Sequence, residues 1–398
     1  MAIRKREWTT SKGERKSAWI VDYRDQHGAR RLKTFARKKD AENWRNEAGH
    51  EVSQGTHTAA SASITVAQAG KLWTDAAEKD GLEKSTVRQY RQHLDLHIVP
   101  RLGTVKLSDL TAPMVRDFET WLRDNGRSAA MVRKVISSLG ALLADAQESG
   151  RVARNVVRER PKKRRTKAIQ ARQDAHIEEG RDYPTPQEVN AALAKLEGYN
   201  RAAFLTVARA GLRSSELRAL RWSDIDFKAK RLHVRQRADR WNKLGAPKSA
   251  AGRRDIPMTP ELVNTLKEWK LECPASKLDL VFPNGAGNVE NHGNLYARVF
   301  GPAWIAGGAA IDTGKKDDDG KPILRPKYGI HSLRHFFASW LINDPQHGGL
   351  GVSPKRAQQV LGHSSLQMTM DTYGHLFPHP GDESEEWGRG EKALAALA

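Results

Sequence analysis

Two stretches in the last fifth of the chain, HSLRH at residues 331–335 and LGHSSLQMTMDTYGH at residues 361–375, are its most informative part. They bring together a fixed cation, neutral proton carriers and a phenol. The residues concerned are His331, Arg334, His363 and Tyr373. Each residue alone has an ordinary structural explanation, such as a surface charge or a half-buried aromatic. In combination they indicate a catalytic site.

Two earlier stretches add further cations. AGLRSSEL at residues 210–217 contains Arg213, and PKSAAGRRDIPM at residues 247–258 contains Lys248. No pair of carboxylates accompanies these residues, so the set does not suit hydrolysis by two acids. It suits attack on a phosphodiester by a tyrosine.

Charge explains this choice. Attack on a phosphodiester builds negative charge on the non-bridging oxygens, and fixed donors aimed at those oxygens usually supply the largest catalytic contribution. Arginine grips phosphate oxygens with two parallel N–H donors, so Arg213 and Arg334 are the predicted clamp. Tyr373 is the predicted nucleophile. Its hydroxyl has a reference pKa of about 10 and needs nearby cations and a base to react.

Proton transfer falls to the remaining candidates. Lys248 can protonate the departing 5′ oxygen as a general acid, with Lys243 as a competing candidate. His331 and His363 can hold protons or donate to the phosphoryl group. His331 and His335 also have the i, i+4 spacing of a helical zinc pair, but Arg334 between them makes the local field positive and the glutamate of an HExxH motif is missing.

These stretches resemble the boxes of the tyrosine recombinases, the phage integrase family, which share their chemistry with type IB topoisomerases. The family's T/A-G-L-R-x-S-E-L box is matched at residues 210–217, and its lysine hairpin before an R-x-I-P strand at residues 248–257. The H-x-L-R-H box is matched at residues 331–335, and L-G-H at residues 361–363 is followed by the tyrosine at position 373. The agreement in order and spacing spans roughly residues 183–377.

The resemblance implies a site-specific DNA recombinase, most naturally an integrase of a phage or mobile element. Each protomer would cut one strand, form a 3′-phosphotyrosine through Tyr373 and release a 5′ hydroxyl that attacks the partner duplex. Four protomers would pass through a four-way junction on double-stranded DNA with core and arm sites. Neither a metal ion nor a nucleotide cofactor would be needed, and a host DNA-bending protein or a directionality factor is a possible partner.

Two other functions remain open at this stage. A type IB topoisomerase would use the same residues to relax supercoils without joining partners, but separate arm and core DNA modules disfavour it. A non-catalytic DNA-binding regulator could keep the fold. The complete set of six residues argues against the regulator.

Composition agrees with a nucleic-acid partner. The 398 residues are too many for one core, and 67 Lys and Arg against 47 Asp and Glu give a net charge of +20. A single cysteine, Cys273, excludes an internal disulfide framework. The sequence shows no apolar signal core and no membrane-length apolar run. We therefore expect a cytoplasmic protein without a membrane partner, and the resemblance implies a bacterial host and association with the nucleoid.

The fold class expected is multidomain α+β. Residues 1–55 predict a small β-sheet-plus-helix domain, with strands over 17–23 and 30–35, a turn at 25–28 and a helix from Ala41 to Val52. This domain loosely resembles an arm-type DNA-binding module. Its alternative is a basic mini-domain with no DNA site of its own.

The middle of the chain predicts a helical domain between two linkers. After a small, polar linker at 53–63, residues 64–152 predict a compact domain of four helices, with the second helix stopped by Pro100 and the third capped by Thr111. The resemblance implies that this is the family's core-binding, SAM-like domain. Residues 153–182 form a basic linker in which PKKRR could cross a DNA backbone, act as a localisation signal or simply be solvated.

Residues 183–398 predict the catalytic domain and a carboxy-terminal tail. The domain should be mainly α with a small antiparallel sheet, and Lys248 should lie near the tip of a hairpin. Thr185 and Glu188 form a capping box at its first helix. Residues 305–330 read as a surface insertion without chemistry. By resemblance the tail would dock on a neighbouring subunit, and the alternative is that it folds back on its own domain.

Overall fold

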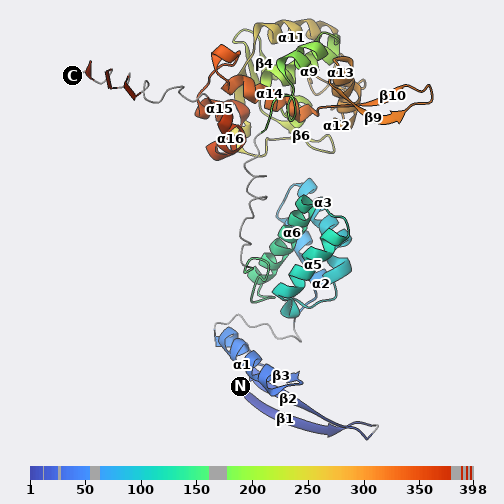
Figure 1. Cartoon of the computed structure of the whole chain (residues 1–398), viewed down its shortest axis with the longest axis vertical. Helices are drawn as coiled ribbons and strands as arrows, with labels where there is room; N and C mark the ends of the chain where they lie inside the picture. Colours follow the sequence, from blue (N-terminus) through green and yellow to red (C-terminus); the bar gives the residue numbers. More distant parts are fainter. Residues whose placement is uncertain are drawn as a thin grey trace. The chain divides into compact units, whose positions relative to one another are not determined.

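The structure is a computed structural model in which residues 1–11, 13–25, 28–53, 63–160 and 177–377 are described, together with the short pieces 387–388, 391–392 and 395–396. The chain divides into two compact units, Met1–Arg164 and Arg165–Ala398. Figure 1 shows the elements of each unit. The chain is thus multidomain, largely helical, with small antiparallel sheets. The centre of the predicted turn at 25–28, most of both predicted linkers and most of the tail lie outside the described residues.

The amino-terminal part is a three-stranded antiparallel sheet with one helix. Its elements are β1 (Ala2–Thr9), β2 (Arg15–Arg24), β3 (Arg30–Phe35) and α1 (Lys38–Ser53), in the sheet order β1-β2-β3. Trp44 of α1 packs against Tyr23 and Phe35, with ring centroids 5.0 and 5.7 Å away. The sequence analysis missed β1, because its alternation is hidden by charged residues on both faces of a strand that is largely exposed.

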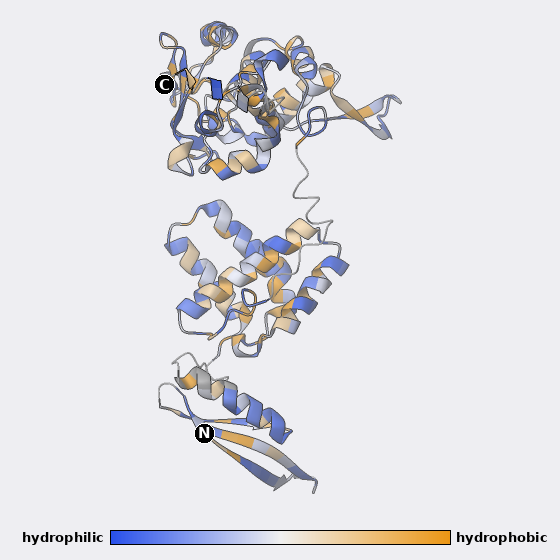
Figure 2. Ribbon diagram, turned by 60° about the vertical axis from the view of Figure 1, so that its left-hand side comes forward, coloured by the Kyte–Doolittle hydropathy of each residue, from blue (hydrophilic) through white to orange (hydrophobic). Residues whose placement is uncertain are grey.

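Residues 63–160 are helical. The elements are α2 (Val66–Lys79), α3 (Lys84–His93), a π-helical turn (Leu94–Ile98), α4 (Val99–Leu102), a 3-10 turn (Leu107–Asp109), α5 (Ala112–Asp124) and α6 (Ala129–Glu148). Apolar residues gather along these helices (Figure 2), and Phe118, Leu139 and Leu142 are fully buried. Thr111 caps α5 as predicted, its hydroxyl accepting from the Met114 N–H.

The prediction that Pro100 stops the second helix was wrong. The helical chain continues through the π-turn into α4 and ends near Gly103. Pro100 lies in the first turn of α4, directly after the π-turn, so the irregular turn lies where a proline interrupts the hydrogen bonds of a continuing helix.

The second unit begins with helices and a small sheet. The elements are α8 (Pro186–Leu193), α9 (Gly198–Ala210), α10 (Ser214–Leu217), a 3-10 turn (Trp222–Asp224), β4 (Ile225–Asp226), β5 (Arg231–Val234), β6 (Arg237–Ala238), β7 (Leu244–Gly245), a 3-10 turn (Ala250–Gly252) and β8 (Arg254–Pro257). The sheet order is β4-β5-β8, and β6-β7 form a separate hairpin. The capping box of Thr185 and Glu188 is present at α8.

The rest of the unit is again mainly helical. The elements are α11 (Pro260–Glu272), α12 (His292–Leu295), a π-turn (Tyr296–Phe300), α13 (Gly301–Ala306), β9 (Ala310–Lys316), β10 (Pro322–Pro326), α14 (Ile330–Ile342), a 3-10 turn (Pro345–His347), α15 (Pro354–Leu361), α16 (Leu366–Tyr373) and a 3-10 turn (Gly374–Leu376). Helix α9 is almost wholly buried and packs against α11 and α14. It forms the centre of the core that positions the site.

Two features of this unit refine the sequence analysis. Lys248 is not at the tip of a hairpin: the β6-β7 hairpin occupies the connection between β5 and β8, and Lys248 follows it in the loop leading to the 3-10 turn Ala250–Gly252. The insertion at 305–330 contains an antiparallel hairpin, β9-β10, which projects from the unit (Figure 1).

Among the described residues, no helix combines the length and the apolar character needed to cross a membrane.

Candidate active site

The end of α9 brings Arg213 into position. Gly211 ends the helix in the left-handed region at φ 59°, and a Cβ there would lie 2.2 Å from Phe337 Cδ1, so only glycine fits. The chain then turns so that Arg213 caps α10. Its guanidinium donates to Glu216 Oε1 at 2.8 Å and to the Gly362 carbonyl at 3.3 Å. With a side chain 36% exposed, Arg213 still faces the surface.

A buried ion pair supports this arginine. Arg254 of β8 donates to Glu216 Oε2 at 2.8 Å and Oε1 at 3.1 Å, and its Nε donates to the Val360 carbonyl at 2.8 Å. Burial alone would raise the pKa of Glu216, but Arg254 and Arg213 outweigh it and lower the pKa to about 2. Glu216 therefore remains ionised and holds two guanidinium groups together. The sequence analysis assigned Arg254 to a strand and gave it no part in the site.

Arg334 joins three motifs from the interior. It lies on α14, is 2% exposed, and donates to the Gly211 carbonyl at 2.7 Å and to the Leu361 carbonyl. Burial lowers its pKa to about 9, with Arg213 and Arg254 adding to the effect, so the guanidinium is still charged at neutral pH. Arg213 and Arg334 thus both connect the end of α9 to the end of α15.

Tyr373 lies at the end of α16 inside the same cluster. It is 2% exposed, and its hydroxyl oxygen lies 2.8 Å from His335 Nδ1. Its ring is parallel to that of His363, with centroids 6.2 Å apart. Burial raises the pKa of Tyr373 to about 12, although Arg334 and Arg213 oppose the rise. In this state the phenol is protonated and covered.

His335 is the contact that sequence reasoning missed. It was part of the HSLRH motif, but only its i, i+4 spacing to His331 drew attention to it. Burial, His331 and Arg334 lower the pKa of His335 to about 4, so its imidazole is neutral at physiological pH. A neutral ring nitrogen can accept the hydrogen bond of the Tyr373 hydroxyl.

The two predicted histidines differ in exposure. His363 is 8% exposed, with its Nδ1 2.9 Å from Thr369 Oγ1, and burial together with Arg334 and Arg213 lowers its pKa to about 4. His331 is exposed at the start of α14, with its ring 4.8 Å from that of His335. Partial desolvation by the surrounding protein still lowers the pKa of His331, as do the charges of Arg334 and Arg213.

Lys248 is exposed, unlike the buried residues of the cluster. The structure places it on an exposed loop, whereas the other five predicted residues meet where α9, α14, α15 and α16 converge. The far end of that loop is fixed, because Arg254 Nη1 donates to the Gly252 carbonyl at 3.1 Å. For the zinc alternative, no group of three or more His, Cys, Asp or Glu side chains among the described residues is placed to hold a metal ion.

The geometry suits an enzyme that acts on an anionic, phosphorus-centred group: guanidinium groups and neutral imidazoles surround one phenol. Comparison with known proteins agrees. Residues 183–379 match the phage integrase family, and residues 65–122 match the phage integrase N-terminal SAM-like domain. The chain belongs to the phage integrase family, the tyrosine-type site-specific recombinases.

Named relatives support this assignment, and solved structures show a similar fold. A tyrosine recombinase XerC-like protein of Caldanaerobacter subterraneus is 24% identical over 375 residues, covering 89% of this chain and 90% of that protein. The integrase of Mycobacterium phage L5 is 26% identical over 384 residues, covering 92% and 93%. In fold, the chain is similar to the Tn1549 transposon integrase in complex with circular intermediate DNA, with a TM-score of 0.62, 18% identity and coverage of 83% and 100%. A lambda integrase tetramer bound to a Holliday junction gives a TM-score of 0.53, 18% identity and coverage of 90% and 95%.

Proposed function

We propose that this recombinase cuts DNA through a covalent 3′-phosphotyrosine at Tyr373, with Arg213 and Arg334 as the phosphate clamp. The Tyr373 oxygen forms a bond to phosphorus, the bond from phosphorus to the 5′ oxygen breaks, and Lys248 gives that oxygen a proton. The observation that carries the proposal is the buried cluster itself. Both arginines act on the phenol strongly enough to oppose the rise of its pKa.

Activation requires Tyr373 to leave its resting position. In the described state its hydroxyl is held beside His335, and its pKa is far above neutral. We propose that DNA binding draws α16 outward, so that the phenol meets the clamped phosphate and passes its proton to solvent or to a histidine. His331, on the exposed rim, and His363, beside the ring, then donate to phosphoryl oxygens.

A second DNA contact is proposed on the amino-terminal sheet. Tyr23 packs on α1, and successive residues of a strand point to opposite faces of the sheet. The residues next to Tyr23 and every second one from there therefore lie on the face opposite α1. Cross-strand pairing puts Arg4 beside Ile20, Arg6 beside Ala18 and Trp8 beside Lys16 on that open face. A cationic face with an exposed tryptophan suits arm-site DNA.

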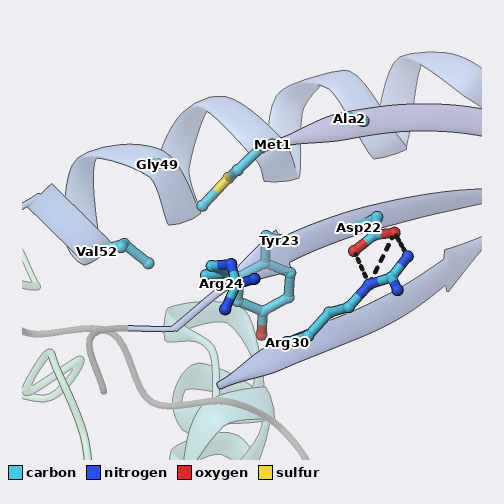
Figure 3. A pocket seen from close by; sticks show the side chains of 8 residues that line it. All are labelled: Met1, Ala2, Asp22, Tyr23, Arg24, Arg30, Gly49 and Val52. Carbon is cyan, nitrogen blue, oxygen red and sulfur yellow. Dashed lines mark hydrogen bonds and ion pairs between the residues drawn. The ribbon is translucent and has the colours of Figure 1, made fainter. Parts of the chain in front are cut away.

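The same sheet also has an internal ion pair. Figure 3 shows Arg30 reaching to Asp22 at one side of an open pocket, with N–O distances of 2.5 to 3.2 Å. Asp22 pairs closely with Arg30 and also lies 3.9 Å from Arg4 Nη2, so the arm contact is assigned first to Arg6, with Arg4 as a weaker candidate.

The assembly proposed is a tetramer on double-stranded DNA. The lambda integrase of similar fold was solved as a tetramer bound to a Holliday junction, and other neighbours are transposon integrases on transposon DNA. We infer that this chain integrates or excises a mobile or phage element, with a DNA-bending protein or a directionality factor as accessory partner.

Covalent capture tests the proposal directly. The substrate is double-stranded DNA with a candidate attachment sequence and a nick near the cut. After attack, the short piece between the cut and the nick, which bears the new 5′ hydroxyl, diffuses away. Religation then fails and the protein stays attached. A denaturation-resistant adduct supports the recombinase. Binding to an attachment sequence that never yields an adduct would indicate the regulator alternative.

Lys248→Ala is expected to lower strand cleavage by about 10²- to 10⁴-fold, the usual range for loss of a general acid. A substrate whose 5′ bridging oxygen is replaced by sulfur does not need that proton and should be cleaved at nearly the wild-type rate. Single-turnover rates on both substrates measure the effect. Lys243→Ala serves as the matched control, because the competing assignment predicts the same pattern for Lys243 and no defect for Lys248.

The site histidines predict a stability loss in mild acid. His335 and His363 have a folded-state pKa of about 4 against an unfolded value near 6.5. Between these two pH values, His335 and His363 bind protons in the unfolded chain but stay neutral in the folded chain. The free energy of unfolding should therefore be unaffected above about pH 6.5 and fall below it, by up to about 1.4 kcal/mol per pH unit for each histidine.

Denaturant unfolding from pH 8 to 4.5 tests this prediction. Burial also lowers the pKa of His93 and His97 in the first unit, so they add to the slope. The site contribution is the part of the slope that disappears in a His335→Gln, His363→Gln double variant. An unchanged slope in that variant would show that the two imidazoles are not held neutral.

A further inference from the structure

Arg218 is a buried arginine to which the reaction described above gives no role. It follows α10, the helix that Arg213 caps, and is 4% exposed. Its guanidinium makes four hydrogen bonds, all to the β6-β7 hairpin or the segment before α12. Nη1 donates to Asn242 Oδ1 at 2.7 Å and to the Glu290 carbonyl at 3.0 Å, and Nη2 donates to the carbonyls of Ala238 at 3.0 Å and Asp239 at 2.8 Å.

This arrangement is costly to maintain. Burial lowers the pKa of Arg218, with Asp239 and Glu290 only partly opposing the shift, and the four oxygens that accept these hydrogen bonds are neutral carbonyl oxygens. An aliphatic side chain could fill the same volume without desolvating a charge. The donors are therefore best explained by what they hold in place.

What they hold is a hairpin too short to be stable alone. Strands β6 and β7 have two residues each, and an isolated two-stranded hairpin is marginal in water even when longer. Asn242, at its turn, has a positive φ of 63°, a conformation asparagine tolerates better than most residues. A second tie comes from Gln236, whose side chain donates to the Ala219 carbonyl at 2.6 Å.

The hairpin leads directly into the loop of Lys248. After β7 ends at Gly245, two residues precede the lysine, and Arg254 holds the far side of the loop through the Gly252 carbonyl. Arg254 also binds Glu216, which binds Arg213. Both ends of the lysine loop are therefore connected to α10, one through Arg218 and one through Glu216.

We propose that Arg218 is a positioning residue that fixes the place of the Lys248 loop relative to Arg213 of the phosphate clamp. The proposal rests on the general-acid role proposed for Lys248. The short helix α10 has Arg213 of the phosphate clamp at its start. At its end, Arg218 fixes the hairpin that leads into the Lys248 loop. Loss of the Arg218 guanidinium leaves the Arg213 clamp intact but allows Lys248 to lie too far from the departing 5′ oxygen to protonate it.

The test compares Arg218→Met and Arg218→Lys on the ordinary substrate and on the 5′-bridging sulfur substrate. Misplacement of an acid by about 1 Å costs on the order of 10²-fold. We expect a loss of about 10- to 100-fold on the ordinary substrate and a rate close to wild type on the sulfur substrate. Asn242→Gly keeps the positive φ and removes one acceptor, so it should show the same pattern more weakly without disturbing the core.

The matched control is Arg201→Met. Arg201 also donates to a backbone carbonyl, that of Leu193 at 2.8 Å, and contacts Glu261, but it lies at the start of α9 and has no tie to the hairpin. It should cleave both substrates normally. A purely structural role for Arg218 would slow both substrates equally in its variants, and that result would overturn the proposal, as would normal cleavage of the ordinary substrate.

Lys248→Ala separates the two levels of the argument. If Lys248→Ala is rescued by the sulfur substrate and the Arg218 and Asn242 variants are not, only the positioning role of Arg218 fails. If Lys248→Ala is not rescued, the general-acid role fails and takes the positioning proposal with it. If Arg218→Met does not fold, the same comparison of the two substrates is made with Arg218→Lys and Asn242→Gly.

Discussion

Tyr373→Phe is expected to abolish covalent capture of nicked DNA, with a loss on the order of 10⁴-fold or more in strand cleavage. The reason is direct, because phenylalanine fills the same buried position but has no oxygen to bond to phosphorus. Arg213, Arg334 and His363 keep their places, since no contact of theirs depends on the hydroxyl. Binding of the same DNA should therefore be retained, which gel-shift titration on the intact site measures.

The variant should also fold. It loses one hydrogen bond, from the Tyr373 hydroxyl to His335, worth about 1 kcal/mol. Tyr296→Phe is the matched control: its half-buried hydroxyl lies 3.4 Å from the Tyr328 carbonyl, and its removal should leave capture unchanged. An adduct that persists in Tyr373→Phe and disappears in Tyr296→Phe would move the nucleophile to another residue.

The sequence allowed the cluster to be predicted because its motifs are local. Arg213, Arg334, His363 and Tyr373 each lie in a short box whose spacing follows from one turn or one helix, such as the glycine that ends α9 before Arg213. Two arginines, histidines and a phenol without paired carboxylates then indicate attack on a phosphodiester by a tyrosine. The structure then brings all four together with His331 where α9, α14, α15 and α16 meet.

The residues that escaped prediction act across long sequence separations. Arg254 of β8 meets Glu216 of α10, 38 residues earlier in the chain, and Arg218 meets the hairpin turn at Asn242. No local pattern marks an arginine as buried, since arginine is mostly exposed in proteins. His335 was hidden differently, because its position beside Tyr373 depends on how α16 packs near α14.

Backbone details were also beyond the sequence. Pro100 was expected to stop a helix, but the π-turn before it shifts the chain so that the proline falls in a first turn. The Lys248 loop was expected as one hairpin, and the extra β6-β7 pair inserted there comprises only two residues per strand. Pairs this short carry no readable alternation.

Glu216→Gln is expected to lower the free energy of unfolding by about 3 to 5 kcal/mol, the cost of breaking a buried pair from one side. Glutamine has nearly the same shape, and its amide oxygen can still accept hydrogen bonds from the two arginines, but its amide nitrogen cannot accept those that Glu216 Oε2 receives from Arg254 Nη2 and the Arg213 backbone N–H. It cannot balance their charge, and Arg334 adds a third guanidinium whose field reaches the same carboxylate. Since Glu216 and Arg254 are each 4% exposed, water cannot replace the lost charge.

The same reasoning predicts a partial rescue by anions. In Glu216→Gln the cluster has excess positive charge, so sulfate or DNA that binds the folded state should recover more stability in the variant than in the wild type. Denaturant unfolding with and without sulfate measures both effects at matched ionic strength. Glu261→Gln is the control, because its pairs with Arg201 and Arg209 are exposed, and it should cost less than about 1 kcal/mol. Equal losses in the two variants would mean that the carboxylate is not the charge around which the cationic site is built.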